Sequence, residues 1–289
     1  MDPGNTTGGG RGDGFAPPPE LAPFARESGG LFLYDAGAGP PLLLLHGNGD
    51  EADTWRQVLP ELATTWRVIA PDLPGFGRSK PVGEGSLSDL AGAVVGLLNA
   101  LDLRGVQVVG SSLGAAVASE VAARARDRVV GLTLVGGGPA GHFGEGGSPL
   151  AAPGVGEAFY NGLRDQGQDA AYATLTPFYT DLAALPEADR AFLRERVWAR
   201  VWSDTQRDAF LAALRSLFTT EALDPVRLSG LPVHLIWGER DVIVPLALAQ
   251  NLRRALPDST LTVLPGVGHL PQQEQPSEFL KALSAVLGA

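Results

Sequence analysis

The fold of this chain is indicated by one stretch, Val108-Val109-Gly110-Ser111-Ser112-Leu113-Gly114-Ala115-Ala116. It joins a short apolar run, which ends at Val109, to an alanine-rich helical pattern that begins at Leu113. Between them stands Gly-x-Ser-x-Gly, and only Ser112 fits its centre, because Ser111 would need glycine at positions 109 and 113. A strand that turns sharply into a helix lifts the middle serine above a sheet, and small neighbours let strand and helix nearly touch. The stretch therefore predicts a nucleophilic serine.

The composition narrows the classes of function. The net charge is −10 and no basic stripe occurs, which argues against nucleic acid and anionic membranes as main partners. The absence of cysteine excludes disulfides, thiol catalysis and Cys-ligated metals. No apolar run reaches the roughly 18 residues that span a bilayer, and the N-terminal residues lack the pattern of a secretory signal. We therefore expect a cytoplasmic protein without a membrane partner.

Apolar runs alternate with helical patterns along most of the chain. The runs that predict strands are 31–34, 41–45, 66–70, 106–109, 129–135, 233–237 and 260–264. This alternation predicts an α/β fold with a mostly parallel, doubly wound sheet covered on both faces. After residue 139 comes a loose, glycine-rich stretch at 144–156, and from about residue 155 to 223 only helical patterns occur, which predicts an inserted all-helical cap. We expect a flexible tail at 1–25, a core at 26–138 and 225–289, and the cap at 139–224.

Capping signals place three of the expected helices. Asp53 can cap a helix whose apolar face runs to Leu62. Ser86 and Asp89 resemble a capping box before a helix that runs to about residue 101, and Ser203-x-x-Gln206 has the same form within the cap. Pro276, a favourable first-turn residue, marks the start of the last expected helix, and the other helices are predicted from periodicity.

Polar residues with complementary chemistry follow three of the predicted strands. Ser112 follows the run at 106–109, Asp241 follows the run at 233–237, and His269 follows the run at 260–264. The carboxyl ends of parallel strands meet at one edge of a sheet, where catalytic groups of open α/β sheets lie. A serine hydroxyl needs a base to take its proton, an imidazole can do so near neutral pH, and a carboxylate holds that imidazole in the right tautomer. The sequence thus predicts a Ser112–His269–Asp241 triad.

Two assignments within the triad have rivals. Glu239 competes with Asp241 for the acid, but Asp241 is followed by an apolar segment ending in proline that would anchor it. Four histidines occur, and only His269 lies in a loop at the catalytic edge. His46, before the Asn48 turn, is interpreted as a packed structural residue and His234, within a strand, as a core residue, whereas His142 begins the predicted cap.

The oxyanion that forms during acyl transfer needs two hydrogen-bond donors. We expect the backbone N–H of Leu113, at the start of its helix, to be one. The backbone N–H of Asn48, in the loop after the run at 41–45, is the candidate for the second, although that loop could also be only a tight turn. Among the cap aromatics, we expect Phe178, Trp198 and Trp202 to bind substrate; the alternative is that such residues only pack the cap helices together.

In these features the chain resembles the α/β-hydrolase fold superfamily over about residues 31–287. The resemblance rests on five motifs: His46-Gly47-Asn48-Gly49, Asp72-x-Pro74-Gly75-x-Gly77-x-Ser79, Gly110-x-Ser112-x-Gly114, Gly238-x-x-Asp241, and Gly268-His269 followed by Glu274 and Pro276. It implies Ser112 as nucleophile, Asp241 as acid, His269 as base and a helical cap over the pocket. Because position 112 is serine, the branches that use an aspartate nucleophile are unlike this chain.

The resemblance implies a serine hydrolase that cleaves carboxylic esters of small to medium apolar substrates through an acyl-enzyme, without cofactor or metal. Alternatives of the same fold are a C–C bond (meta-cleavage product) hydrolase, an enol-lactonase and a cofactor-free haloperoxidase. The C–C hydrolases usually carry an aromatic residue after the histidine, whereas Leu270 follows His269 here. A non-catalytic ligand-binding protein is a further alternative. The expected partner is a small ester or related carbonyl compound, and the sequence leaves the oligomeric state open.

Overall fold

The computed structural model describes residues 15–141 and 148–288. Most of the expected tail, residues 1–14, and the histidine at position 142 lie outside these described residues. The tail does not extend to residue 25, because Leu21 is fully buried and Ala25 begins a strand. The boundary predicted at residue 25 is therefore corrected: the core begins at or before Leu21.

An eight-stranded sheet forms the centre of the described chain. Its strands are β1 (Ala25–Ser28), β2 (Leu31–Ala36), β3 (Pro41–Leu45), β4 (Arg67–Pro71), β5 (Val106–Ser111), β6 (Val129–Val135), β7 (Val233–Gly238) and β8 (Thr260–Leu264). In space they follow the order β1-β2-β4-β3-β5-β6-β7-β8. The pairs from β4 to β8 are parallel, and β1 and β2 join antiparallel at one edge. The mostly parallel α/β sheet predicted from the sequence is confirmed.

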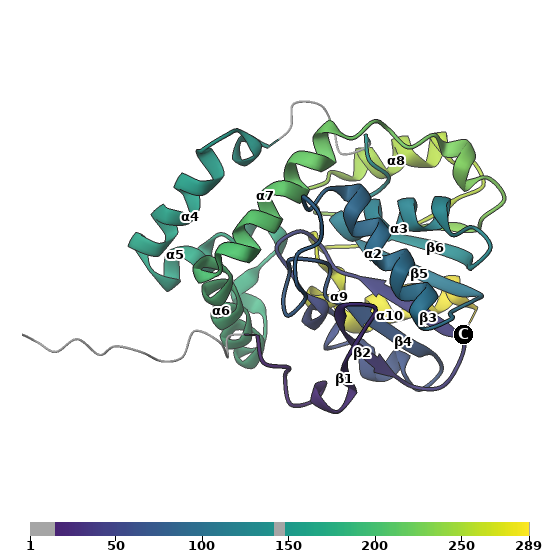
Figure 1. Ribbon diagram of the computed structural model, residues 1–289, viewed down its shortest axis with the longest axis horizontal. Helices are drawn as coiled ribbons and strands as arrows, with labels where there is room; N and C mark the ends of the chain where they lie inside the picture. The colour runs from purple at the N-terminus through teal and green to yellow at the C-terminus, as the bar shows by residue number, and fades with distance from the viewer. Residues whose placement is uncertain (1–14, 142–147, 289) are drawn as a thin grey trace, which may run out of the picture.

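Helices cover both faces of this sheet (Figure 1). Those of the core are α1 (Leu59–Leu62), α2 (Leu87–Ala100), α3 (Leu113–Arg124), α8 (Leu246–Ala255), α9 (Pro271–Glu274) and α10 (Pro276–Leu287), with short 3-10 turns η1 (Ala22–Phe24), η2 (Ala52–Trp55) and η6 (Pro225–Leu228). The capping box of Ser86 and Asp89 is present at the start of α2.

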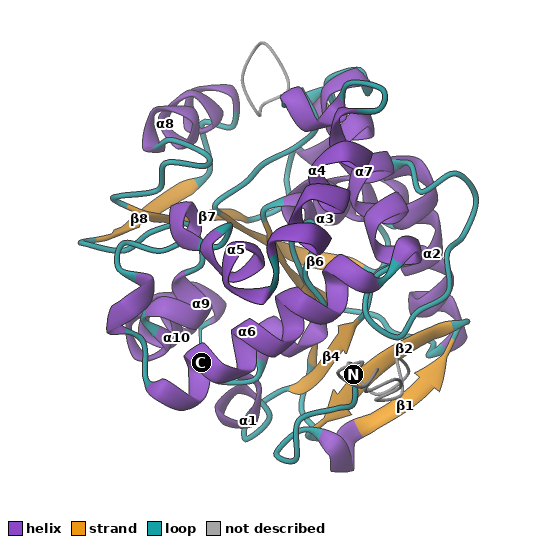
Figure 2. Cartoon of the chain, turned by 90° about the vertical axis from the view of Figure 1, so that its left-hand side faces the viewer, coloured by secondary structure: helices purple, strands orange, loops and turns teal. Residues whose placement is uncertain are grey.

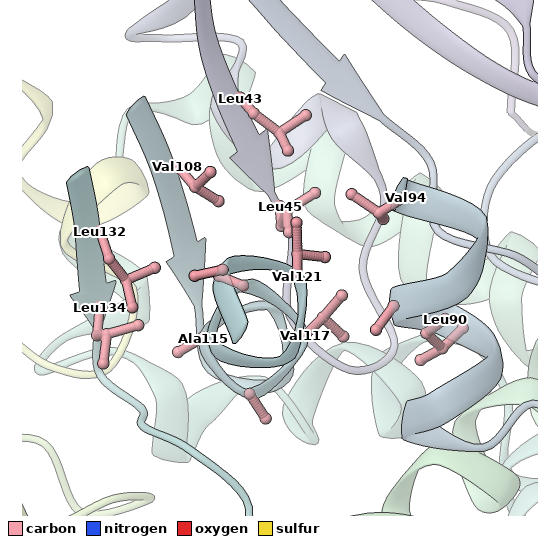
Figure 3. Close-up of a cluster of buried hydrophobic side chains, with 14 of the residues drawn as sticks. Leu43, Leu45, Leu90, Val94, Val108, Ala115, Val117, Val121, Leu132 and Leu134 are labelled. Carbon is pink, nitrogen blue, oxygen red and sulfur yellow. The ribbon is translucent and has the colours of Figure 1, made fainter. Parts of the chain in front are cut away.

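Alternate residues of β3 bury against opposite layers, which is why the run at 41–45 is apolar throughout. Leu43 and Leu45 pack with the α2 and α3 side, where Figure 3 shows them directed toward Val117 and Val121 of α3 and Leu90 and Val94 of α2. Leu42 and Leu44 belong to the opposite cluster, with Trp55 of η2 and Phe279 of α10. Burial on both faces is the usual condition of a strand in a parallel sheet.

The regular elements described between β6 and β7 are all helices or 3-10 turns. They include η3 (Pro149–Ala151), α4 (Val155–Gln166), α5 (Gln168–Ala173), η4 (Thr176–Phe178), η5 (Leu182–Ala184), α6 (Glu187–Trp202) and α7 (Asp204–Thr219). In the view of Figure 2, α5 and α6 lie in front of the sheet. We call α4 to α7 with the turns between them the cap. Helix α7 also packs on the core, because Ala213 and Leu217 belong to the cluster beneath α2 and α3.

Two local predictions are corrected by the structure. The helix expected from Asp53 to Leu62 is instead the turn η2 followed by one helical turn, α1. Asp53 does not cap it, because its carboxylate is buried and accepts hydrogen bonds from Tyr34 and Arg78. Strand β1, which precedes the first predicted strand, was not expected, since the sequence ARES has no apolar alternation and its burial pattern is largely exposed.

Candidate active site

Ser112 stands at a sharp turn between β5 and α3. Its backbone lies in the left-handed region, with φ 55° and ψ −119°. The turn can form because its neighbours lack side chains: a Cβ at Gly110 would overlap the backbone of Gly114, and a Cβ at Gly114 would lie 2.6 Å from the carbonyl oxygen of His46. A strained backbone at a non-glycine residue is often part of a functional site. The hydroxyl is thereby presented at the amino end of α3.

His269 and Asp241 form a buried hydrogen-bonded pair. The Nδ1–H of His269 donates to Oδ2 of Asp241 across 2.7 Å, and neither side chain is more than 1% exposed. The other oxygen of Asp241 accepts the N–H groups of Ile243 and Val244, at 2.9 and 2.8 Å. Because Nδ1 carries the proton in this arrangement, Nε2 is left with its lone pair as an acceptor. Nε2 has no hydrogen-bond partner among the described residues.

The rival acid, Glu239, has another function in the structure. Its carboxylate accepts the N–H of Gly266 across 2.9 Å and so holds the beginning of the loop that carries the histidine. The structure therefore brings Asp241, and not Glu239, to the imidazole. The two other described histidines have other contacts. His46 is fully buried, and His234 in β7 forms a hydrogen bond with the hydroxyl of Thr260.

The histidine loop is also bonded to the cap. The backbone N–H of His269 donates to the carbonyl of Phe178 across 2.9 Å. The carboxylate of Glu274 accepts the N–H of Gly268 at 2.7 Å and the N–H of Thr180 at 2.9 Å. Glu274 thus links the catalytic loop to the cap segment that follows η4. The position of Glu274 five residues after the histidine is one of the motifs of the sequence, but nothing in the sequence indicates its partner in the cap.

The two predicted oxyanion donors lie beside the serine. The loop that carries Asn48 lies close to the serine, since a Cβ added at Gly47 would be only 3.2 Å from that of Ser112. Neither the N–H of Asn48 nor that of Leu113 donates to another backbone group within the described part of the chain. The side-chain amide of Asn48 donates instead to the carbonyl of Phe210 across 3.2 Å, which ties this loop to α7.

His46 fixes the start of the same loop. Its Nε2 accepts the N–H of Leu73 at 2.8 Å, and its Nδ1–H donates to the carbonyl of Gly47 at 2.8 Å. Complete burial lowers the pKa of His46 below 6.5 despite the nearby carboxylates. The ring is therefore neutral. Its two hydrogen bonds position the loop, and neither of them involves Ser112.

A small cavity lies where these groups meet. Its volume is about 60 Å³. Its lining contains Ser112 and His269 together with Gly47, Asn48, Gly49, Asp50, Leu175, Phe178, Tyr179, Leu193, Arg200, Leu270 and Gln273. Of the three aromatic residues expected to bind substrate, Phe178 lines this cavity. Trp198 and Trp202 do not: their rings pack against each other at 5.7 Å, and Trp202 is 44% exposed.

Arg200 reaches the cavity from α6 and pairs with two carboxylates of the core. Its guanidinium donates to Asp50 at 2.7 Å and to both oxygens of Glu51 at 2.9 and 3.0 Å. Burial alone would lower the pKa of Arg200, but Glu51 and Asp50 hold it above its ordinary value. Burial would likewise raise the pKa of Glu51, and Arg200 holds it low. Both groups are therefore charged, and each satisfies the other.

The same charge network continues away from the cavity. Arg196, one turn earlier on α6, pairs with Asp53 at 2.6 Å. Asp53 also accepts from Arg78, which pairs in turn with Asp72 at 2.7 Å. Burial and the charge of Glu51 raise the pKa of Asp53 to about 6. These ion pairs hold the Asp72 to Ser79 loop against η2, the turn that contains Asp53.

The described residues contain neither a metal centre nor a membrane-spanning helix. No group of three or more acidic, histidine or cysteine side chains could hold a metal ion there. In the same residues, no helix has both the length and the apolarity that crossing a bilayer requires.

The sheet order, the serine at the strand–helix turn and the inserted cap define the class of this protein as an α/β-hydrolase fold. The model of the alpha/beta hydrolase family matches residues 42–282, and the chain belongs to that family. It is therefore a hydrolase by family, as the resemblance implied.

Named relatives span several reactions. The chain is 31% identical to a 2-hydroxy-6-oxononadienedioate/2-hydroxy-6-oxononatrienedioate hydrolase of Cupriavidus pinatubonensis, over 89% of this chain and 90% of the relative. It is 30% identical to a pimeloyl-(acyl-carrier protein) methyl ester esterase of Chromobacterium violaceum, over 88% and 96%. Among solved structures, a thermophilic esterase from Thermogutta terrifontis superposes with a TM-score of 0.73 at 27% identity, covering 89% and 93%. These relatives agree on the family but catalyse different reactions, so the geometry of the site has to indicate which reaction this protein catalyses.

Proposed function

We propose that this protein is a serine hydrolase that cleaves carboxylic esters of small to medium apolar substrates through an acyl-enzyme intermediate. One observation supports the proposal above the others. His269 is held through Nδ1 by Asp241, and its Nε2 has no partner among the described residues while it shares a cavity with Ser112. An imidazole with one nitrogen anchored and the other available is the arrangement of a general base.

The chemistry follows from these positions. The hydroxyl of Ser112 attacks the ester carbonyl as Nε2 of His269 takes its proton, and Asp241 stabilises the imidazolium. The N–H groups of Asn48 and Leu113 donate to the carbonyl oxygen as it gains negative charge. The imidazolium then protonates the departing alkoxide, which leaves an acyl group on Ser112. Water, deprotonated by the same imidazole, releases the acid and restores the serine.

A C–C bond hydrolase is the principal alternative, because a relative with that activity is about as similar as the named esterase. The substrate named for that relative is a dicarboxylate. Here the only guanidinium that lines the described cavity already carries two carboxylates, and Leu270 follows the histidine where an aromatic residue is usual. Both features favour ester cleavage. Enol-lactonase and cofactor-free haloperoxidase activities use the same groups and are tested by the same variants.

The test is turnover of p-nitrophenyl esters from acetate to decanoate by the wild type and by Ser112→Ala. We expect turnover by the wild type and its loss in the variant. Labelling with a fluorophosphonate distinguishes an enzyme from a binding protein, because only an activated serine reacts. The matched control is Ser111→Ala, which removes the adjacent hydroxyl: label must remain in that variant and disappear in Ser112→Ala. A folded wild type that neither turns over esters nor takes the label would refute the proposal.

A further inference from the structure

We infer that Asp50 and Arg200 form a specificity-determining ion pair that makes the pocket accept uncharged acyl chains and reject acyl chains ending in a carboxylate. The inference rests on the proposed ester hydrolysis. It concerns the part of the substrate that stays on Ser112 after the alcohol leaves, because this acyl group must occupy the cavity beside the serine.

Both members of the pair line that cavity. They come from different parts of the chain: Asp50 follows β3 and its oxyanion loop, and Arg200 lies near the end of α6 in the cap. The cavity is small, with a volume of about 60 Å³, and Ser112 shares its lining with both charged residues. The polar end of an acyl chain that extends from Ser112 along this side of the cavity therefore lies close to both charges.

The positive charge of Arg200 is already matched. Asp50 and Glu51 both accept hydrogen bonds from its guanidinium, and Glu51 is fully buried behind it. The side chains of Arg200 and Asp50 are themselves only 11% and 15% exposed. One guanidinium between two carboxylates leaves this end of the cavity with a formal charge of −1.

The neighbouring ion pairs do not reverse that sign. Arg196 is matched by Asp53 and Arg78 by Asp72, so each adds one positive and one negative charge. A carboxylate brought into the cavity would meet the Asp50 carboxylate without a surplus cation, and like charges at such a site oppose binding strongly. A neutral chain carries no such cost, and Leu175, Phe178 and Leu193 offer it apolar contacts.

The test compares three substrates of equal chain length with the wild type: the p-nitrophenyl esters of valeric acid, of glutaric acid as its monoester, and of glutaramic acid. The glutaramate carries an amide of nearly the same shape as the carboxylate, which separates charge from size. We expect kcat/KM for the glutarate monoester to be at least about tenfold below those of both neutral esters. A glutarate monoester turned over as well as the neutral esters would overturn the inference while leaving ester hydrolysis intact.

A variant tests the residue itself. Asp50→Asn removes one carboxylate and leaves Arg200 paired with Glu51 alone, so this end of the cavity becomes neutral and the ratio of glutarate to valerate turnover should rise about tenfold or more. The matched control, Asp165→Asn, removes an exposed carboxylate of α4 that does not line the cavity, and it should leave the ratio unchanged. An unchanged ratio in Asp50→Asn would overturn the assignment. If that variant does not fold, the three-substrate comparison with the wild type decides alone. Absence of valerate turnover by the wild type would instead count against the proposed function.

Discussion

Replacing Glu274 by glutamine should lower both stability and turnover, because this carboxylate joins the catalytic loop to the cap. One of its oxygens accepts the N–H of Gly268, which directly precedes the catalytic histidine, and the other accepts the N–H of Thr180. Glutamine keeps one acceptor oxygen but turns an NH2 group toward the second N–H. One of the two backbone groups is then left unpaired, and the other loses a charged acceptor.

The magnitude follows from these two bonds. Hydrogen bonds to charged groups contribute about 1.5–3 kcal/mol each, but the N–H of Thr180 is exposed and can bond to water when its acceptor is lost. We expect the free energy of unfolding of Glu274→Gln to fall by about 1–2 kcal/mol, mainly through the weaker bond to Gly268. A small displacement of a catalytic group can lower the rate on the order of 100-fold. Since His269 follows Gly268 directly, we expect kcat to fall by about 10–100-fold, with a smaller change in KM.

The assay is p-nitrophenyl ester turnover well below the melting temperature, together with urea unfolding. The matched control is Glu278→Gln, the same substitution four residues later. Glu278 pairs with Lys281 on the surface, where the two side chains are 52% and 72% exposed. Surface pairs of this kind contribute about 0–1 kcal/mol. Equal unfolding midpoints and equal kcat for the two variants would show that Glu274 does not position the histidine loop.

Three further outcomes are expected. Gly114→Ala should destabilise the protein by about 1–3 kcal/mol or more, because the new Cβ would lie 2.6 Å from a backbone carbonyl oxygen. Gly92→Ala should stabilise it by about 0.5–1 kcal/mol, because Gly92 lies in α2 and a Cβ there would have no atom within 4 Å. Thermal unfolding in which both variants change stability in the same direction would contradict this prediction. Phe178→Ala should lower kcat/KM for apolar esters about tenfold and Trp202→Ala should leave it unchanged, because of these two residues only Phe178 lines the cavity. Equal losses of kcat/KM in the two variants would show that Phe178 does not contact the substrate there. Burial lowers the pKa of His46, so below about pH 6.5 the unfolded chain takes up a proton that the folded chain does not. The free energy of unfolding should therefore be unaffected by this group above that pH and should fall below it by up to about 1.4 kcal/mol per pH unit. Urea unfolding should show a steeper loss of stability with falling pH for the wild type than for His46→Gln.

The sequence predicted the parts of the fold that local patterns determine. The strand–turn–helix around Ser112 is one, because the overlap that requires glycine at 110 is with the backbone of Gly114, only four residues later, although the glycine at 114 is required by a carbonyl of a distant segment, that of His46. The apolar run at 41–45 is another, because burial on both faces leaves no polar position. The triad could be expected because each member follows a strand of the same parallel sheet.

The sequence could not predict contacts between distant segments. Arg200 pairs with Asp50 from 150 positions away, and no periodicity or motif indicates such a partner. Asp53 is a residue type that often caps helices, but its carboxylate is instead buried, where it accepts hydrogen bonds from Tyr34 and Arg78. Trp198 and Trp202 were expected at the pocket because they are aromatic, yet their position on α6 directs them to each other. In each case tertiary contacts decide what a local pattern leaves open.

The ion pairs between α6 and residues 50–53 also affect how this protein can be recombined with its relatives. Glu51 and Asp53 are fully buried in the core, and their guanidinium partners belong largely to the cap. A cap grafted from a relative without those arginines would leave Glu51 without its ion-pair partners and Asp53 with Arg78 alone, at a cost of about 3–5 kcal/mol for the broken Glu51 pair. The loop after β3 and helix α6 therefore have to be transferred together, and crossover points in gene shuffling should keep both segments from one parent.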